Sequence, residues 1–341
     1  MNLDKLEKIL SSEPSYRKKQ VKDAVFKQLM DDWEQAMTLP PALREKLNRE
    51  CPLKVLAETF TNKKGDVTKA RISQSRKSKT AGRALANHWI ETVLMRHKDG
   101  RNTVCVSSQI GCSLACGFCA TGQMGFVRNL EPMEIVEQVL FFARILKKQS
   151  SRVNNVVFMG MGEPFLNFKN VIAAVEILNE KDCLNVGARH ISISTVGVPS
   201  AILKLAEEKL QINLAVSLHA ANDDTRSYLI PANKKYPLKK IFFDVNKYIK
   251  LTNRKVMFEY VLIKDVNDSV ADAKALAKLI RHPLYFLNLG TYNPTSASFA
   301  PSSKRQAEEF KKILKEEKIE FVQRYSFGRD IAAACGQLAG R

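Results

Sequence analysis

From about residue 100 onward, short runs rich in β-branched and aromatic residues alternate with longer amphipathic stretches, and this alternation constrains the fold more than any other feature. Strands that alternate with helices are typical of βαβ units, whose strands lie parallel in one sheet. We expect strands at 103–107, 153–159, 190–194, 213–218, 256–263, 284–289 and 321–325, and helices at about 131–148, 168–180, 198–209, 238–251, 268–281 and 305–317. Six or so such units predict an α/β protein with a full or partial parallel barrel.

The first 100 residues have a different texture. Apolar stripes at helical spacing predict a small helical unit over residues 1–60, interrupted at Pro40 and Pro41. Residues 61–83 hold eight lysines and arginines against one acid, Asp66. We interpret this stretch as a surface loop or hairpin, either a solvated linker or an arm that contacts phosphates. The predicted divisions are a helical unit (1–60), a basic loop and strand extension (61–100), the barrel (101–295) and a C-terminal extension (296–341).

The charge of the chain favours a polyanionic partner. Lysine and arginine total 54 and aspartate and glutamate 35, a net charge of +19. A field of that sign attracts nucleic acid, although a basic surface without a partner is the simpler alternative. No stretch approaches the roughly 18 apolar residues of a membrane span, and residues 1–10 lack the apolar core of a signal peptide. We therefore expect a cytoplasmic protein with no membrane contact.

Four of the seven cysteines fall within fifteen residues, which in a reducing compartment indicates metal binding or redox chemistry. Cys112, Cys116 and Cys119 form a C-x-x-x-C-x-x-C triplet after the first predicted strand. Thiolates are the usual ligands of iron–sulfur clusters, and three cysteines leave one iron of a four-iron cluster open to a small molecule. The alternatives are zinc, which usually takes four ligands, and three buried structural cysteines.

Polar or glycine-containing segments also stand at the carboxyl ends of other predicted strands. The candidate ligand-binding residues among them are Gly162, Glu163, Ser194, Ser217, Leu218, His219 and Asn293. The carboxyl ends of parallel strands meet at one rim, which is the functional face of an α/β barrel. Any one of these residues alone is explained equally well as a turn or cap. Together they predict a binding site at that rim.

Three further residues have unremarkable local surroundings. Cys105 lies in a strand-like run, and small residues flank Cys335 near the C-terminus. A free cysteine is most often a buried small apolar residue, and the same interpretation is applied to Cys51 and Cys183. Glu91 lies in a predicted strand just before the barrel, where an acid ordinarily faces solvent.

The order and spacing of these motifs resemble the RlmN/Cfr family of radical S-adenosylmethionine (SAM) RNA methyltransferases. The similarity rests on CVSSQIGC at 105–112, CATGQMGFVRNL at 119–130, FMGMGEPFLN at 158–167 and AAACGQLAG at 332–340, with shorter matches at 191–197, 217–219 and 292–294. The cysteine triplet alone is shared by radical SAM enzymes in general, whereas the combination is specific. The resemblance implies a partial parallel (β/α)6 radical SAM barrel with a small N-terminal helical domain and a C-terminal extension.

The resemblance also implies the cofactors and the reaction. A 4Fe-4S cluster on Cys112, Cys116 and Cys119 would bind SAM at its open iron, beside the rim residues named above. One SAM would methylate Cys335, and a second would be cleaved to a 5′-deoxyadenosyl radical that removes hydrogen from this methyl. The carbon radical would add to an adenine ring, which ordinary SAM methylation cannot attack because an aromatic C–H is not a nucleophile. Glu91 matches the family's proton acceptor, and Cys105 would then form a disulfide with Cys335 and release the RNA.

The family's substrate is an adenine of 23S ribosomal RNA, and some members also modify transfer RNA. Residues 126–130 and 163–164 resemble the type that methylates adenine C2, whereas 24–28 and 291–295 resemble the C8 type, and 66–89 departs from both. We expect C2 methylation by a monomer with a flavodoxin-type electron donor, with C8 methylation as the alternative. Two other hypotheses are a radical SAM enzyme with a different substrate and a non-enzymatic iron–sulfur RNA-binding protein.

Overall fold

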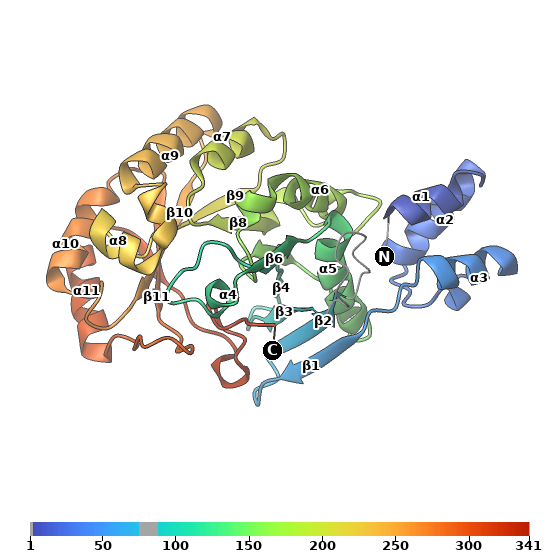
Figure 1. Ribbon diagram of the computed structural model, residues 1–341, viewed down its shortest axis with the longest axis horizontal. Coiled ribbons are helices and arrows are strands. Elements are labelled where there is room, and N and C mark those ends of the chain that lie inside the picture. Colours follow the sequence, from blue (N-terminus) through green and yellow to red (C-terminus); the bar gives the residue numbers. More distant parts are fainter. Residues whose placement is uncertain (1–2, 75–87, 341) are drawn as a thin grey trace.

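A ten-stranded sheet forms the centre of the molecule in a computed structural model, which describes residues 3–74 and 88–340 (Figure 1). The strand order is β1-β2-β3-β4-β7-β8-β9-β10-β11-β12. Strands β1 to β4 pair antiparallel, and from β4 onward each strand pairs parallel with the next. The strands are β1 (Ala57–Thr61), β2 (Val67–Ser73), β3 (Trp89–Arg96), β4 (Asn102–Cys105), β7 (Asn155–Phe158), β8 (Ile191–Thr195), β9 (Asn213–Ser217), β10 (Val256–Leu262), β11 (Tyr285–Thr291) and β12 (Phe321–Gln323).

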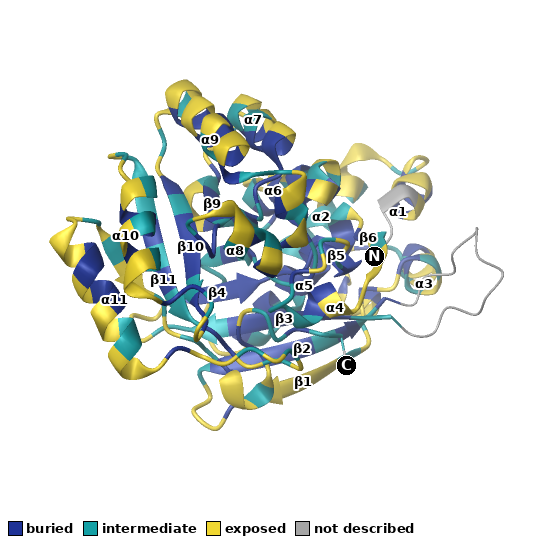
Figure 2. Ribbon diagram, turned by 60° about the vertical axis from the view of Figure 1, so that its left-hand side comes forward, coloured by how far each residue is buried: buried dark blue, intermediate teal, exposed yellow. Residues whose placement is uncertain are grey.

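Six helices connect the parallel strands and complete the predicted partial barrel. They are α5 (Pro132–Lys147), α6 (Phe168–Asn179), α7 (Pro199–Glu207), α9 (Leu238–Thr252), α10 (Val270–Leu279) and α11 (Lys304–Glu316). Figure 2 shows their outer faces exposed and the strands beneath them buried. The predicted alternation is confirmed, because each predicted strand and helix of the barrel overlaps an observed one.

Several short elements were not predicted, because each is too short to show a periodic apolar pattern. A separate hairpin pairs β5 (Gln109–Gly111) with β6 (Phe126–Asn129). The remaining short helices are α4 (Ala120–Gln123), α8 (Asp223–Leu229), η1 (Trp33–Gln35), η2 (Pro164–Asn167), η3 (Ala188–His190), η4 (Pro231–Lys234) and η5 (Arg329–Ile331). The β5–β6 hairpin and α4 flank the cysteine triplet, so the loop that carries it is held at both sides.

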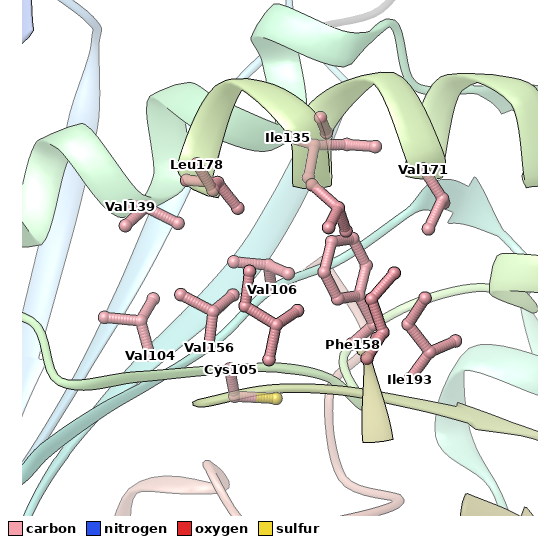
Figure 3. Close-up of a cluster of buried hydrophobic side chains, with 14 of the residues drawn as sticks. Val104, Cys105, Val106, Ile135, Val139, Val156, Phe158, Val171, Leu178 and Ile193 are labelled. Carbon is pink, nitrogen blue, oxygen red and sulfur yellow. The ribbon is translucent and has the colours of Figure 1, made fainter. Parts of the chain in front are cut away.

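The first strand of the barrel separates core from site by simple alternation. Val104 and Val106 point toward the covering helices α5 and α6, whereas the Cys105 thiol points to the opposite face of the sheet (Figure 3). Successive side chains of a strand lie on opposite faces. Val156 of β7 and Ile193 of β8 belong to the same buried cluster as the two valines. Cys105 is therefore placed in the interior of the barrel by the same pattern that builds the core.

Three helices, α1 (Leu3–Leu10), α2 (Ser15–Phe26) and α3 (Pro41–Glu50), lie beside the barrel (Figure 1). Pro41 begins α3 instead of interrupting a helix, since proline fits the first helical turn. Lys27 forms an ion pair with Asp182 at 2.9 Å, and Lys147 Nζ donates to the Gln28 carbonyl at 2.6 Å. These contacts fix the helical unit to the connections around α5 and α6.

The described part of the basic stretch forms an antiparallel hairpin, in which Lys69 and Arg71 lie on β2. The remainder of the stretch, from residue 75 to 83, lies outside the described residues. Among the described residues, no helix is both long and apolar enough to cross a membrane.

Candidate active site

A cavity of about 1530 Å³, its open mouth included, lies at the carboxyl ends of the parallel strands. Every parallel strand contributes a lining residue from its carboxyl-terminal half or from the position directly after it. The first is Cys105 at the end of β4, and the last is Arg324 after β12. Five of the seven cysteines line it: Cys105, Cys112, Cys116, Cys119 and Cys335. The fold therefore brings the segment 105–119 together with Cys335, which lies more than 200 positions later in the chain.

The loop of the cysteine triplet begins where β5 ends. Gly111 has φ +71°, and a Cβ there would lie 1.8 Å from the Gly125 carbonyl oxygen, so only glycine fits. The Cys112 amide donates to the same oxygen at 2.9 Å and closes the hairpin. At the far end of the loop, the Cys119 amide donates to the Cys116 carbonyl at 3.1 Å. These two backbone hydrogen bonds hold the loop at both of its ends.

The three thiols suit a cluster. Burial raises the pKa of Cys112 to about 12, and burial also raises the pKa values of Cys116 and Cys119. A cluster bound here would have to displace the protons of these thiols, since iron–sulfur clusters are held by thiolates. No three acidic, histidine or cysteine side chains within 3–74 and 88–340 form a group suited to a single metal ion. A cubane cluster makes a different demand, because each cysteine binds a different iron.

Gly162 and Glu163 form part of the wall after β7. Gly162 has φ +96°, and a Cβ would lie 2.5 Å from the Gln109 Cβ. The Glu163 carboxylate accepts from the Phe165 amide at 3.0 Å and the Val196 amide at 2.9 Å, yet burial raises its pKa to about 6. Glu163 therefore holds two turns of the wall in addition to facing the cavity.

Of the four predicted site residues at the ends of β8 and β9, three line the cavity and one, Leu218, does not. Ser194 Oγ and Ser217 Oγ lie 3.3 Å apart and both line the cavity. His219 also lines it; burial lowers its pKa to about 3, and its Nδ1 accepts from the Val261 amide at 3.2 Å. The ring is therefore neutral. Leu218 is fully buried in the core and does not belong to the lining.

Cys105 and Cys335 face the same cavity, although 230 positions separate them. Both are free thiols; Cys105 is buried and Cys335 is exposed. Burial, followed by the charge of Cys335, raises the pKa of Cys105 to about 12, whereas the positive charge of Arg324 lowers it. Cys335 is exposed and lines the cavity, so the interpretation from residue type alone, a buried apolar residue, is wrong. The role that the resemblance implies for it stays a prediction.

Asn293 connects the end of β11 to the segment that carries Cys335. Its Nδ2 donates to the Cys335 carbonyl at 3.1 Å, and its Oδ1 accepts from Arg329 Nε at 2.7 Å. Asn293 also lines the cavity. The side-chain amide of Asn293 therefore holds the segment that carries Cys335 against the end of β11.

Glu91 lies beside the cavity, outside its lining. It is 1% exposed, so the expectation of a solvent-facing acid is wrong. One carboxylate oxygen lies 3.0 Å from Lys69 Nζ, and the other accepts from the Ala339 amide at 2.8 Å. Glu91 thus contacts the C-terminal segment a few residues beyond Cys335.

Sequence reasoning missed three charged residues around the cavity. Arg324 pairs with Glu259 at 3.0 Å, and both line the cavity. Arg226 is 1% exposed and donates to the carbonyls of Val196, Ser217 and Leu218, which holds the ends of β8 and β9 together. Arg324 lies near the carboxyl end of the strand predicted at 321–325, so the rim argument applied to the other strands would have found it. Arg226 lies on a helix too short to predict.

Comparison with known proteins finds relatives along the whole chain. Residues 106–278 match the radical SAM superfamily. A probable dual-specificity RNA methyltransferase RlmN of Pseudothermotoga lettingae is 41% identical over 95% of this chain and 91% of its own. One of the same name from Dictyoglomus thermophilum is 40% identical over 99% and 94%. The crystal structure of a radical SAM methyltransferase from Sphaerobacter thermophilus is similar with a TM-score of 0.92 at 41% identity, covering 100% of this chain and 98% of that one.

Proposed function

Because this chain belongs to the RlmN family of radical SAM RNA methyltransferases, we propose that it methylates carbon 2 of an adenine in 23S ribosomal RNA through an S-methylated Cys335. Enzymes of this superfamily use a 4Fe-4S cluster and SAM.

One observation carries the proposal: Cys335 and Cys105 line the same cavity as the cysteine triplet. A cluster-binding loop alone supports any radical SAM reaction. A second pair of free thiols at the same cavity supports a reaction in which one cysteine carries a carbon group and the other releases it. A non-enzymatic RNA-binding protein would have no use for this pair.

In the proposal, Cys112, Cys116 and Cys119 hold the cluster. SAM lies against Gly162, Glu163, Ser194, Ser217, Leu218, His219 and Asn293. Leu218 is buried, so its contribution is to shape the wall behind its neighbours. When bound, the cluster supplies the electron that cleaves SAM and makes radical chemistry at a methyl carbon possible.

The chain's own residues then have separate tasks. The Cys335 sulfur loses its proton and takes up the methyl group, and its exposed position lets this carbon reach the RNA base. Glu91 accepts the proton of the adenine ring. Cys105 attacks the Cys335 sulfur: the S–S bond forms, the bond between this sulfur and the carbon joined to the base breaks, and that carbon keeps the electron pair and takes up a proton to become the methyl group. The two cysteines are thereby oxidised to a disulfide as the carbon is reduced. The His219 ring is a poor proton acceptor beside these residues, because burial lowers its pKa to about 3 and its Nδ1 already accepts from the Val261 amide.

The net charge of +19 supports a large RNA substrate. The target adenine must leave its stack to enter the cavity. We include transfer RNA as a second substrate and C8 as the alternative carbon, and we propose a cytoplasmic monomer that takes electrons from a flavodoxin-type protein.

The test is mass spectrometry of nucleosides from 23S ribosomal RNA and transfer RNA in cells that lack the gene or have it restored. We expect 2-methyladenosine to disappear from ribosomal RNA on deletion and to return with the wild-type gene. Gain and loss of 8-methyladenosine instead would select the alternative carbon. If neither nucleoside follows the gene in either RNA, adenine methylation is refuted.

Two variants test the role of Cys335. Cys335→Ala should abolish methylation, because no thiol remains to carry the carbon. Cys51→Ala is the matched control, since Cys51 is 1% exposed and does not line the cavity. Full methylation by the Cys335→Ala variant would exclude the S-methyl intermediate.

A further inference from the structure

A buried ion pair joins two strands outside the barrel to the C-terminal segment. Lys69 of β2 and Glu91 of β3 lie 3.0 Å apart, and their side chains are 10% and 2% exposed. Lys69 is aligned with Val93 across the strand pair, so its side chain reaches Glu91 along a diagonal of the sheet. The pair lies on the β2–β3 face that the C-terminal segment contacts.

Both members of the pair also bind the segment that carries Cys335, one on each side of it. Lys69 Nζ donates to the Ala332 carbonyl at 3.4 Å, three residues before Cys335. The Ala339 amide donates to the Glu91 carboxylate at 2.8 Å, four residues after it. Between these two contacts, the chain runs along the cavity. At its last described residue the segment still follows β3, since a Cβ added at Gly340 would lie 2.6 Å from the Trp89 carbonyl oxygen.

A neighbouring arginine shows that the sheet does not need this pair for local charge balance. Arg71 is aligned directly with Glu91 across the two strands, yet it pairs outward with Glu58 at 3.1 Å. Glu58 is half exposed, so that contact lies at the surface. Burying a lysine and a carboxylate costs solvation free energy that an apolar pair would not lose. The proposed proton transfer accounts for Glu91 alone, whereas contacts with the segment that carries Cys335 account for the buried lysine as well.

We propose that Lys69 is a positioning residue: together with Glu91 it clamps residues 332 and 339 to the β2–β3 wall and thereby sets where Cys335 lies at the cavity. The inference rests on the proposed function only in treating Cys335 as the methyl carrier. The clamp itself is a property of the folded chain.

The first test is hydrogen exchange of the purified protein without RNA, followed by mass spectrometry of the peptide that covers residues 332–340. In Lys69→Met we expect this peptide to exchange about tenfold faster, because the contact that orients Glu91 toward the Ala339 amide is lost. Arg71→Met is the matched control, because Arg71 lies on the same strand and the same face as Lys69 and the variant loses the same charge. It should leave the exchange rate of the 332–340 peptide unchanged. Equal exchange in wild type and Lys69→Met would overturn the proposal.

A buried, unpaired Glu91 could unfold the Lys69→Met protein. The double variant Lys69→Met/Glu91→Leu removes both charges and keeps an apolar wall, a replacement that folded proteins usually tolerate. It should free the C-terminal peptide as Lys69→Met does, while peptides from β7 to β10 exchange at the wild-type rate. If its C-terminal peptide stays protected, other contacts position Cys335 and the clamp is refuted.

The second test measures methylation of Cys335 with SAM and no RNA, by the mass of the intact protein. Each protein molecule takes up one methyl group under these conditions, so the measured quantity is a single-turnover rate constant. We expect this rate constant at saturating SAM to fall about tenfold in Lys69→Met, while the SAM concentration that gives half of it stays near its wild-type value, because a displaced thiol affects attack more than binding. Lys69→Arg should restore most of the rate. A higher half-saturating SAM concentration with an unchanged rate constant, or no restoration by arginine, would argue against positioning. If the wild-type protein itself gains no methyl group, the proposed function fails, and the exchange experiment still decides the clamp.

Discussion

Replacing Gly162 with alanine should damage the cavity wall in a way that can be calculated from its geometry. At φ +96°, an alanine costs about 1–2 kcal/mol. Its Cβ would lie 2.5 Å from the Gln109 Cβ and 2.8 Å from the Gln109 nitrogen, and overpacking of this kind adds about 1–3 kcal/mol. The two effects together predict a loss of about 2–5 kcal/mol in the free energy of unfolding.

The measurement is thermal unfolding followed by circular dichroism. Unfolding entropy is about 2.1 cal/mol/K per residue, or about 0.7 kcal/mol/K for 341 residues, so Gly162→Ala should lower Tm by about 3–7 °C. Methylation should also fall at least about tenfold, since Gln109 Oε1 accepts from the Glu163 amide at 2.8 Å and a displaced Gln109 moves this part of the wall.

Gly100→Ala separates backbone strain from the clash. Gly100 also has a left-handed φ, +83°, but a Cβ added there would meet no atom within 4 Å beyond its chain neighbours. This variant should lose only the backbone contribution of about 1–2 kcal/mol, a Tm decrease of about 1–3 °C, and keep its activity. Equal losses in the two variants would refute the reasoning that close packing against Gln109 requires glycine at position 162.

Two further predictions concern charge around the cavity. Arg324→Met should lower the free energy of unfolding by about 1.5–3 kcal/mol, because Glu259 loses a charge-assisted hydrogen bond from a side chain that is 32% exposed, and keeps the one from Asn288. Urea unfolding measures this, and a loss below about 1 kcal/mol would show that the pair is dispensable. Burial lowers the pKa of His219 from 6.5 to about 3, so the unfolded chain binds a proton there that the folded chain does not, and stability is lost as pH falls from about 6.5 toward 3. Between pH 6.5 and 3, the free energy of unfolding of the wild type should therefore fall by up to about 1.4 kcal/mol more per pH unit than that of His219→Gln. If the free energies of unfolding of the two proteins change with pH in parallel, the lowered pKa of His219 is contradicted.

The strands and helices of the barrel were predictable because each is indicated by the pattern of residues within its own short stretch of sequence. The strand–helix alternation is a repeated pattern of short apolar runs and amphipathic stretches, and each predicted element of the barrel overlaps an observed one. The rim followed from the same pattern, since parallel strands must present their carboxyl ends on one edge. The short elements that frame the triplet, such as α4 and the β5–β6 hairpin, were missed because three or four residues show no period.

The sequence by itself determined the order of the elements, the cysteine triplet and the edge of the sheet on which chemistry takes place, since each depends on residues close together in the chain. Only the tertiary structure decided that Cys335 is exposed at the cavity, that Glu91 is buried against Lys69, and that Arg324 pairs with Glu259. The contact between Lys69 and Glu91 joins residues 22 positions apart, and the contact between Glu91 and the Ala339 amide joins residues 248 positions apart. Their existence depends on the path of the chain around the sheet, and no local pattern of residues encodes that path.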